Sequence, residues 1–221
     1  KNIAIGNYAM DGVTTLAATE NVFIGMHSGG GSWTGALSSH NVAVGNHTMF
    51  GALNASFRNT CMGWSAGNDI VAGDDNVLIG YEAGSAITSG AYNVFIGAYA
   101  GLENEGGHKN IFIGGEAGEH ASDGSTNVES PDNSIAIGFR TLFGTATPDN
   151  EIVIGDVAVG QGDNSVTLGN ASVTDVYMAQ DKGAIVHCSG VYSKTAATGL
   201  AFYGTEATVK LTLADDATTT I

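Results

Sequence analysis

A short apolar run that opens with asparagine and closes with glycine recurs ten times along the chain. In order, the runs are NIAIG (2–6), NVFIG (21–25), NVAVG (41–45), NTCMG (59–63), NVLIG (76–80), NVFIG (93–97), NIFIG (110–114), NSIAIG (133–138), NEIVIG (150–155) and NSVTLG (164–169). The closing glycines follow one another at a nearly regular interval. Self-similarity at such a period predicts a solenoid, in which each repeat is one turn of backbone and stacked turns create the core.

Each run is short, rich in Val, Ile and Phe, and bounded by glycine, which favours a strand over a helix. Because side chains alternate along a strand, Val22 and Ile24 share one face and Phe23 takes the other. Neither face is polar, and a strand that is apolar on both faces is covered on both. We therefore expect one face to fill the solenoid and the other to meet a second layer, for which another subunit is a candidate. One repeat is long enough for a coil of two short strands and their turns.

The asparagine and glycine of each run predict structural columns. Glycine after a strand fits a turn with positive φ or a close approach between coils. Asparagine fits a turn in which its side chain bonds nearby backbone, and stacked copies can pair as a ladder. We interpret both columns as structural rather than ligand-binding, and they include Asn21, Gly25, Asn41, Gly45, Asn76, Gly80, Asn93, Gly97, Asn110 and Gly114.

A second motif follows many of the glycines, as in GWSAG (63–67), GYEAG (80–84), GAYAG (97–101) and GGEAG (114–118). Its small residues predict a second strand or bend that packs closely. A polar stretch of variable length comes next, and length variation at one place per repeat maps insertions to one edge of the solenoid. The longest insertion, at 119–132, either binds a polar ligand such as a glycan or keeps the protein soluble. We expect function on this edge rather than in the repeat core.

The runs NSIAIG, NEIVIG and NSVTLG resemble the head repeats of trimeric autotransporter adhesins, and the longer form N-V-F-I-G-x-x-A-G is similar to repeats of bacteriophage tail fibres and other surface fibres. The resemblance covers roughly residues 2–173. It implies an all-β fold, a left-handed parallel β-roll of about ten coils, with three chains side by side as a homotrimer. Most coils here are longer than the adhesin repeat, so we expect the extra edge residues to bulge outward.

The same resemblance implies an extracellular structural and adhesive segment of a trimeric viral tail fibre or spike that serves host-cell attachment. Its partners would be two further copies of itself and a glycan or protein of the host cell surface. Two alternatives stay open: the head domain of a bacterial trimeric autotransporter adhesin, and a non-catalytic part of a glycan-degrading spike.

The repeat pattern stops near residue 173, which predicts two domains. Residues 1–173 form the roll. Residues 174–221 carry alternating runs at 173–177, 185–188 and 209–213 that predict short strands of a separate C-terminal β unit. We expect the native chain to continue beyond residue 221.

Composition and charge exclude several classes of partner. The formal net charge is −15 with only seven Lys and Arg, whereas a nucleic-acid-binding surface must be basic. No apolar run approaches the roughly 20 residues of a spanning helix, so we expect no membrane insertion. The 33 glycines with only two prolines indicate repeated tight turns rather than disorder.

The titratable residues give no catalytic pattern. His27 and His47 each lie two residues after a repeat glycine and could stack one coil apart, but no metal-ligand spacing supports a closed site. Aspartates directly before a strand asparagine fit turn chemistry better than calcium binding; they are Asp74 with Asp75, Asp132, Asp149 and Asp163.

Other candidate chemistry is equally sparse. The carboxylate pairs Glu103 with Glu105 and Glu116 with Glu119 lie in polar stretches where solvated charge is usual, although such pairs serve glycosidases. We predict no enzyme, no cofactor and no metal site. Cys61 is interpreted as a buried thiol. The aromatic residues are interpreted as packing groups, although a sugar-binding surface would use exposed ones; they are Trp33, Phe57, Trp64, Tyr81 and Tyr99.

Overall fold

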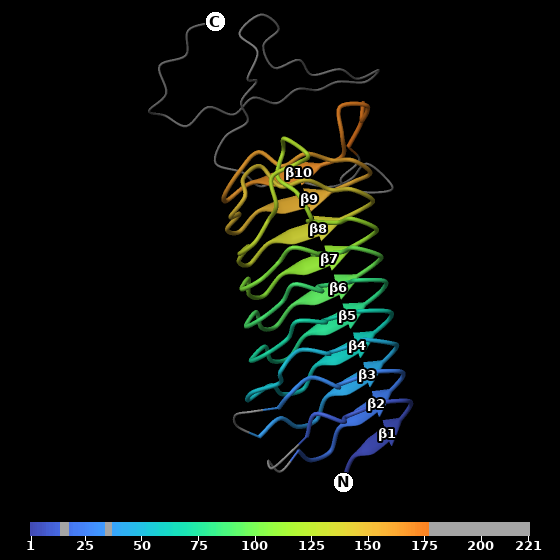
Figure 1. The fold of residues 1–221 in the computed structure, drawn as a ribbon. Coiled ribbons are helices and arrows are strands. Elements are labelled where there is room, and N and C mark those ends of the chain that lie inside the picture. Colours follow the sequence, from blue (N-terminus) through green and yellow to red (C-terminus); the bar gives the residue numbers. More distant parts are fainter. Residues whose placement is uncertain (14–17, 34–36, 177–221) are drawn as a thin grey trace, which may run out of the picture. The chain divides into compact units, whose positions relative to one another are not determined.

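The computed structural model describes residues 1–13, 18–33 and 37–176, and in them the chain is a β-solenoid of about nine turns without a helix. Ten three-residue strands form one parallel sheet in chain order (Figure 1). The strands are β1 (Ile3–Ile5), β2 (Val22–Ile24), β3 (Val42–Val44), β4 (Thr60–Met62), β5 (Val77–Ile79), β6 (Val94–Ile96), β7 (Ile111–Ile113), β8 (Ile135–Ile137), β9 (Ile152–Ile154) and β10 (Val166–Leu168). The predicted parallel β-solenoid is confirmed, and its left-handedness and trimeric state stay predictions.

The chain separates into two compact units, Lys1–Thr174 and Asp175–Ile221. The first unit contains all ten strands. The strands predicted at 185–188 and 209–213, and the end of the one predicted at 173–177, lie outside the described residues.

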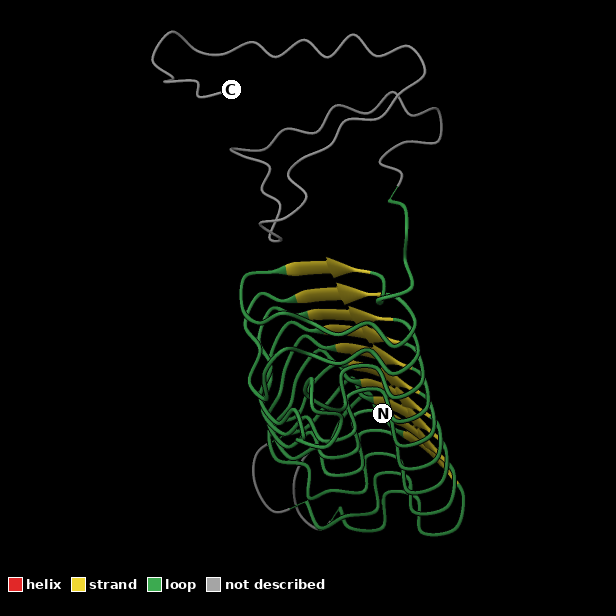
Figure 2. Ribbon diagram, turned by 90° about the horizontal axis from the view of Figure 1, so that it is seen from above, coloured by secondary structure: helices red, strands yellow, loops and turns green. Residues whose placement is uncertain are grey.

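Every strand pairs with the next in strict register. Val77 lies opposite Val94, and Val94 lies opposite Ile111. Figure 2 shows that the strands stack on one side of the roll and that loops and turns form its other sides. Equivalent positions of each repeat therefore become columns that run along the roll.

The asparagines that open the runs form a buried ladder. Asn93 donates from its backbone N–H and from Nδ2 to Oδ1 of Asn76, both at 3.0 Å, and its Nδ2 also donates to the carbonyl of Gly107 at 2.8 Å. The same pattern joins Asn2, Asn21, Asn41, Asn59, Asn76, Asn93 and Asn110. Because buried amides need partners, the ladder fixes each coil on the one before it.

The last three runs enter the ladder one residue later than the sequence pattern indicated. Ser134 donates its backbone N–H to Oδ1 of Asn110, and Glu151 donates its own to Oγ of Ser134. Asn133, Asn150 and Asn164 instead precede the ladder in left-handed conformation, with φ of 53°, 53° and 57°. The ladder residue always lies four positions before the closing glycine, and the extra residue in these runs is therefore the asparagine.

The second strand expected in each coil is not present in the described residues. Beyond the closing glycines these residues form turns and isolated bridges. In the second coil Gly25, His27 and Gly29 have φ of 135°, 58° and 61°, and three such residues within five positions break an extended backbone. The expected bend is therefore what the G-x-x-A-G motif forms.

Two columns of residues share the space of the core: the central residue of each strand and the fourth residue after the closing glycine. In coils whose central strand residue is Phe or Leu, the fourth residue after the closing glycine is also glycine. Gly101 lies against the Phe95 ring, and a Cβ there would collide with it. In two coils whose central strand residue is alanine, that place holds a long side chain at the core, as in the pairs Ala43 with Met49 and Ala4 with Met10, whereas in the coil of Ala136 the buried side chain is that of Phe143. The result is the close packing expected of a protein interior.

Candidate interaction surface

The outward face of the sheet is apolar along its whole length. In β2 to β9 the central residue of each strand is buried, so the first and third residues point outward. Of the twenty outward positions in ten strands only Thr60 is polar, and none carries a charge. We call this surface the outward face. In a chain with net charge −15, such a uniform exclusion of charge needs a physical reason.

The outward face is exposed in the single chain. The exposed fraction is 47% for Met62, 37% for both Ile111 and Ile113, and 63% for Val166. Nine steps between strands of about 4.8 Å give the face a length of about 43 Å. Large contiguous apolar patches on soluble proteins mark interaction sites.

A second apolar feature, the aromatic row, follows the closing glycines. It consists of Tyr8, His27, His47, Trp64, Tyr81 and Tyr99, whose successive ring centroids lie 4.9, 5.0, 6.3, 4.9 and 5.2 Å apart. Trp64 and Tyr81 are stacked at an interplanar angle of 14°, so each ring covers a face of the other. His27 and His47, which the sequence placed one coil apart, are neighbours, and their rings are tilted by 31° to each other rather than stacked. This row stabilises the stack of coils and leaves ring edges at the surface.

The other aromatic candidates from the sequence divide between core and edge. Trp33 is buried, packs edge-on against Phe23 and donates its indole N–H to the carbonyl of Gly29 at 3.1 Å. Phe57 is half-buried and lies under the guanidinium of Arg58.

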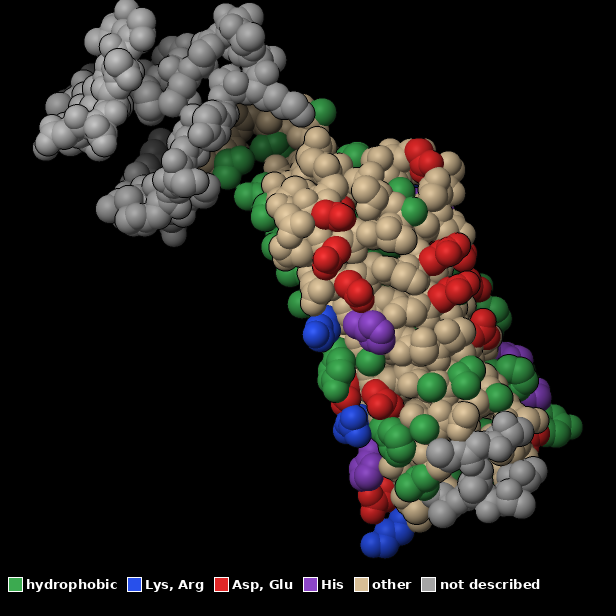
Figure 3. Space-filling model, turned by 90° about the vertical axis from the view of Figure 1, so that its left-hand side faces the viewer, with side chains coloured by type: hydrophobic (Ala, Val, Ile, Leu, Met, Phe, Trp, Pro, Cys, Tyr) green, Lys and Arg blue, Asp and Glu red, His purple; other side chains and the backbone are tan. Residues whose placement is uncertain are grey.

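A polar column borders the opposite edge of the sheet, at the residue before each ladder position. It comprises Lys1, Glu20, His40, Arg58, Asp75, Tyr92, Lys109, Asn133, Asn150 and Asn164, and all but Lys1 are left-handed. Two pairs of its side chains meet: His40 lies 2.6 Å from Glu20, and Arg58 binds Asp75 through two hydrogen bonds of 2.6 Å that lower the pKa of Asp75. Figure 3 shows these charged side chains and histidines following one another along one edge.

A hollow interrupts this polar column at the level of β6 to β8. It has a volume of about 280 Å³ and is lined by Tyr92, His108, Lys109, Asp132 and Asn133. We call it the corner hollow. The sequence did not indicate it, because its residues come from three coils. One feature of the sequence could have indicated the hollow. In the column of residues directly before the polar column, Ala91 stands between Asp74 and His108, and its small side chain leaves space there.

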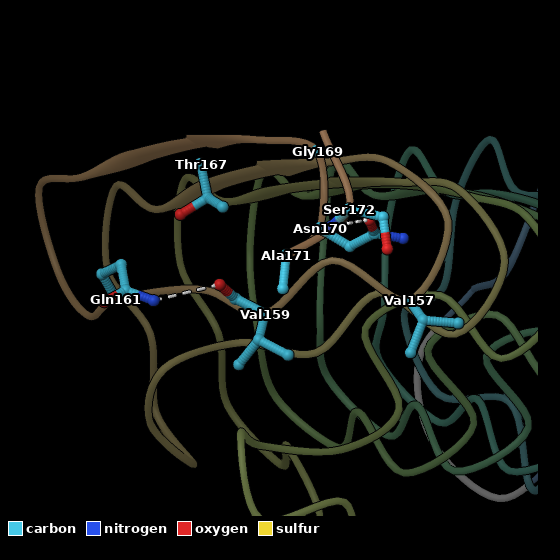
Figure 4. Close-up of a pocket in the computed structure, with 8 residues that line it drawn as sticks. All are labelled: Val157, Val159, Gln161, Thr167, Gly169, Asn170, Ala171 and Ser172. Carbon is cyan, nitrogen blue, oxygen red and sulfur yellow. Dashed lines mark hydrogen bonds between the residues drawn. The ribbon is translucent and has the colours of Figure 1, made fainter. Parts of the chain in front are cut away.

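A larger cavity of about 520 Å³ lies at the last described coil (Figure 4). Its walls are Val157, Val159, Gln161, Thr167, Gly169, Asn170, Ala171 and Ser172. Gln161 Nε2 donates to the carbonyl of Val159 at 3.2 Å, and the Ser172 N–H donates to Asn170 Oδ1 at 2.9 Å. None of the eight lining residues is charged.

The aspartates before the strands bond to backbone of the preceding coil. Asp74 Oδ1 accepts the N–H of Phe57 at 2.7 Å, and Asp132 Oδ1 accepts that of His108 at 2.8 Å. Asp163 does the same for Asp149 at 3.1 Å. In the described part of the chain no three His, Cys, Asp or Glu side chains converge as metal ligands would.

The glutamates and the cysteine considered for chemistry lie apart from a common site. Glu116 pairs with Arg140 at 2.9 Å, and Glu119 lies 3.5 Å from His120 while burial raises its pKa. Glu103 is half-buried and Glu105 exposed. Cys61 is a buried free thiol whose pKa burial raises.

The long insertion, residues 119–132, buries Ala121 and Val128 in the core and exposes residues 122–126. An antiparallel bridge joins His120 to Asn127. The Asp123 carboxylate accepts bonds from the backbone N–H groups of Ser125 and Thr126 and from the Thr126 hydroxyl, and these bonds lower its pKa to about 2. The bonds close the loop on itself.

The structural repeat residues occupy the positions that hold the coils together. The asparagines lie in the ladder, and the closing glycines of the first nine coils have φ of 133° to 145°. A Cβ on any closing glycine of the first eight coils would collide with the carbonyl oxygen of the next closing glycine. This holds for the predicted Gly25, Gly45, Gly80, Gly97 and Gly114.

Comparison with known proteins adds no relative, because no protein-family model, curated protein or solved structure matches the chain. Among the described residues no helix is long and apolar enough to cross a membrane. The fold defines the chain as a β-solenoid repeat protein, and its geometry must carry any statement of function.

Proposed function

We propose that this chain is a structural and adhesive segment of a homotrimeric viral tail fibre or spike, outside the cell, that serves attachment to a host. The observation that carries the proposal is the outward face, which is apolar over ten strands in an acidic chain. Burial of apolar surface stabilises assembly by roughly 25 cal/mol per Å² removed from water. A copy of the same chain has the same length as the outward face, so it can lie along the whole of that face.

The arrangement of the apolar surfaces supports a closed ring of copies, of which the proposed trimer is one. The outward face and the aromatic row lie on either side of the closing glycines. Over the first six coils, where the aromatic row runs, a copy can therefore present one surface to each of two neighbours. Contacts between unlike surfaces generate rings when the rotation closes. Three parallel rolls would form a rigid shaft and leave the insertion edge and the corner hollow available for a glycan or protein of the host surface.

Paired variants test the interface. Ile96→Lys with Ile113→Lys places two charges on the outward face, where both side chains are partly exposed in the single chain, at 36% and 37%. Ser89→Lys with Ser130→Lys adds the same charge at exposed positions of the loop edge. Sedimentation velocity should show that the isoleucine variant dissociates to folded single chains while the serine variant sediments as the unmodified protein does. Equal sedimentation of both variants would reject the outward face as the interface.

The rival owner is a bacterial trimeric adhesin, whose head would use the same assembly. Neighbouring genes separate the two. Tail or baseplate genes beside this gene support the viral fibre, and a membrane anchor encoded at the end of the same chain supports the bacterial adhesin.

A further inference from the structure

We propose that the corner hollow binds one neutral pyranose ring of a saccharide. This inference deepens the adhesive part of the proposed function and does not depend on the trimer. The hollow of about 280 Å³ lies just below the range of about 300–1,000 Å³ that holds drug-sized ligands, so its size fits a single sugar ring.

The local backbone builds the hollow. Tyr92, Lys109 and Asn133 precede the ladder in three successive coils and have φ of 62°, 59° and 53°, which places them at a sharp corner. His108 and Asp132 stand one residue earlier. Backbone hydrogen bonds join these coils: the Lys109 N–H donates to the Ala91 carbonyl, and the Asn133 N–H donates to the His108 carbonyl. These bonds hold the lining residues at a fixed spacing.

The hollow presents donors and acceptors together, as sugar hydroxyl groups require. His108 Nδ1 accepts the Ala91 N–H at 3.1 Å, which assigns the ring proton to Nε2 as a donor. Asp132 uses Oδ1 for the His108 N–H, and its Oδ2 is left to accept. Asn133 donates from Nδ2 to Asp149 at 3.2 Å, and its Oδ1 is an acceptor. Within the described residues Lys109 has no ion pair, so its ammonium can donate.

Tyr92 supplies an apolar platform that the aromatic row cannot. Its side chain is 58% exposed, and in the part of the chain described it stacks on no other ring. The rings of Trp64 and Tyr81, by contrast, cover each other. A free aromatic face beside converging polar groups suits the mixed apolar and hydroxyl surface of a pyranose.

Charge selects a neutral sugar. The Lys109 ammonium is balanced inside the hollow by the Asp132 carboxylate, and the chain as a whole carries a net charge of −15. A sugar carboxylate would therefore meet Asp132 and an acidic surface. A sugar hydroxyl group both donates and accepts hydrogen bonds. It can therefore bond to the Lys109 ammonium and to the Asp132 carboxylate without electrostatic repulsion.

The test is titration of the full 221-residue chain with methyl α-D-glucopyranoside, methyl α-D-galactopyranoside, methyl α-D-mannopyranoside and the acidic methyl glucuronide, followed by ligand-observed NMR and calorimetry. We expect one neutral pyranoside to bind and the glucuronide to bind at least about tenfold more weakly. Failure of all three neutral pyranosides to bind overturns the proposal. Preference for the glucuronide, lost in Lys109→Gln, overturns the neutral class.

Matched variants locate the binding. Tyr92→Ala should weaken it about tenfold or more, whereas Tyr81→Ala, in the aromatic row, should leave it unchanged. Asp132→Asn should weaken it by a similar factor, because a hydrogen bond to a charged group is lost. Asp74→Asn, the equivalent aspartate outside the hollow, is its control. Binding that survives both hollow variants overturns the assignment. Sedimentation of the same samples reports assembly separately, so failure of sugar binding and failure of the trimer are distinguishable.

Discussion

Single residues in this roll are explained by the volume available to them. A glycine stands at position 101 because Phe95 occupies the space that a side chain there would need. Met49 stands at the corresponding place beside Ala43, with φ of 48°. In these two coils the pair of positions therefore carries one large side chain, supplied by one column or by the other.

This exchange predicts a rescue. Phe95→Ala should lower the free energy of unfolding by about 3–5 kcal/mol because it opens a cavity. Gly101→Met should also destabilise, since its side chain meets the Phe95 ring. The double variant should be more stable than the sum of the two losses predicts, as the Ala43 and Met49 pair suggests. Denaturant unfolding of all four proteins at one chain concentration measures the coupling. Strictly additive losses would show that the columns do not share space.

At the scale of the coil, much of the architecture follows from the sequence. The recurrent N-x-x-x-G runs predict parallel strands in chain order because only stacking of equal turns gives such a period. The expected second strand fails because the pattern of apolar residues does not report left-handed residues such as His27 and Glu82. The ladder shift at Ser134 and Glu151 could have been found by counting back from the closing glycine.

The candidate sites were less predictable than the strands. The outward face is visible in the sequence, since Val22 and Ile24 share a face and both are apolar. The corner hollow is not, because Tyr92, Lys109 and Asp132 belong to different repeats and converge only when the coils stack. Which side chains meet across coils depends on the lengths of the loops between strands. These lengths vary here from repeat to repeat, so the contacts could not be predicted.

The closing glycines carry the stacking of one coil on the next, which predicts a difference between two glycines that both have positive φ. Gly80 has φ of 145° and a Cβ there would collide with the Gly97 carbonyl, whereas Gly124 has φ of 70° with open space around it. Gly124→Ala should cost only the strain of a left-handed residue, about 1–2 kcal/mol. Gly80→Ala should cost more, since neighbouring coils must separate. Thermal unfolding compares them, and equal losses would mean that backbone conformation alone explains the glycine column.

At the scale of the whole roll, residues 1–174 form a one-dimensional stack with a stable interior and an unusually apolar exterior on one side. The interior is accounted for by the ladder and by the core columns. We propose that copies of the chain cover the apolar outward face. One border of the outward face is the polar column, and the other is the aromatic row.

The most direct measurement of this claim is the mass of the unmodified full chain by sedimentation equilibrium. One chain weighs 22.4 kDa. We expect a single species with three times the mass of one chain, and we expect it to persist on dilution. A folded single chain of 22.4 kDa, stable over the same range of concentration, would contradict the account.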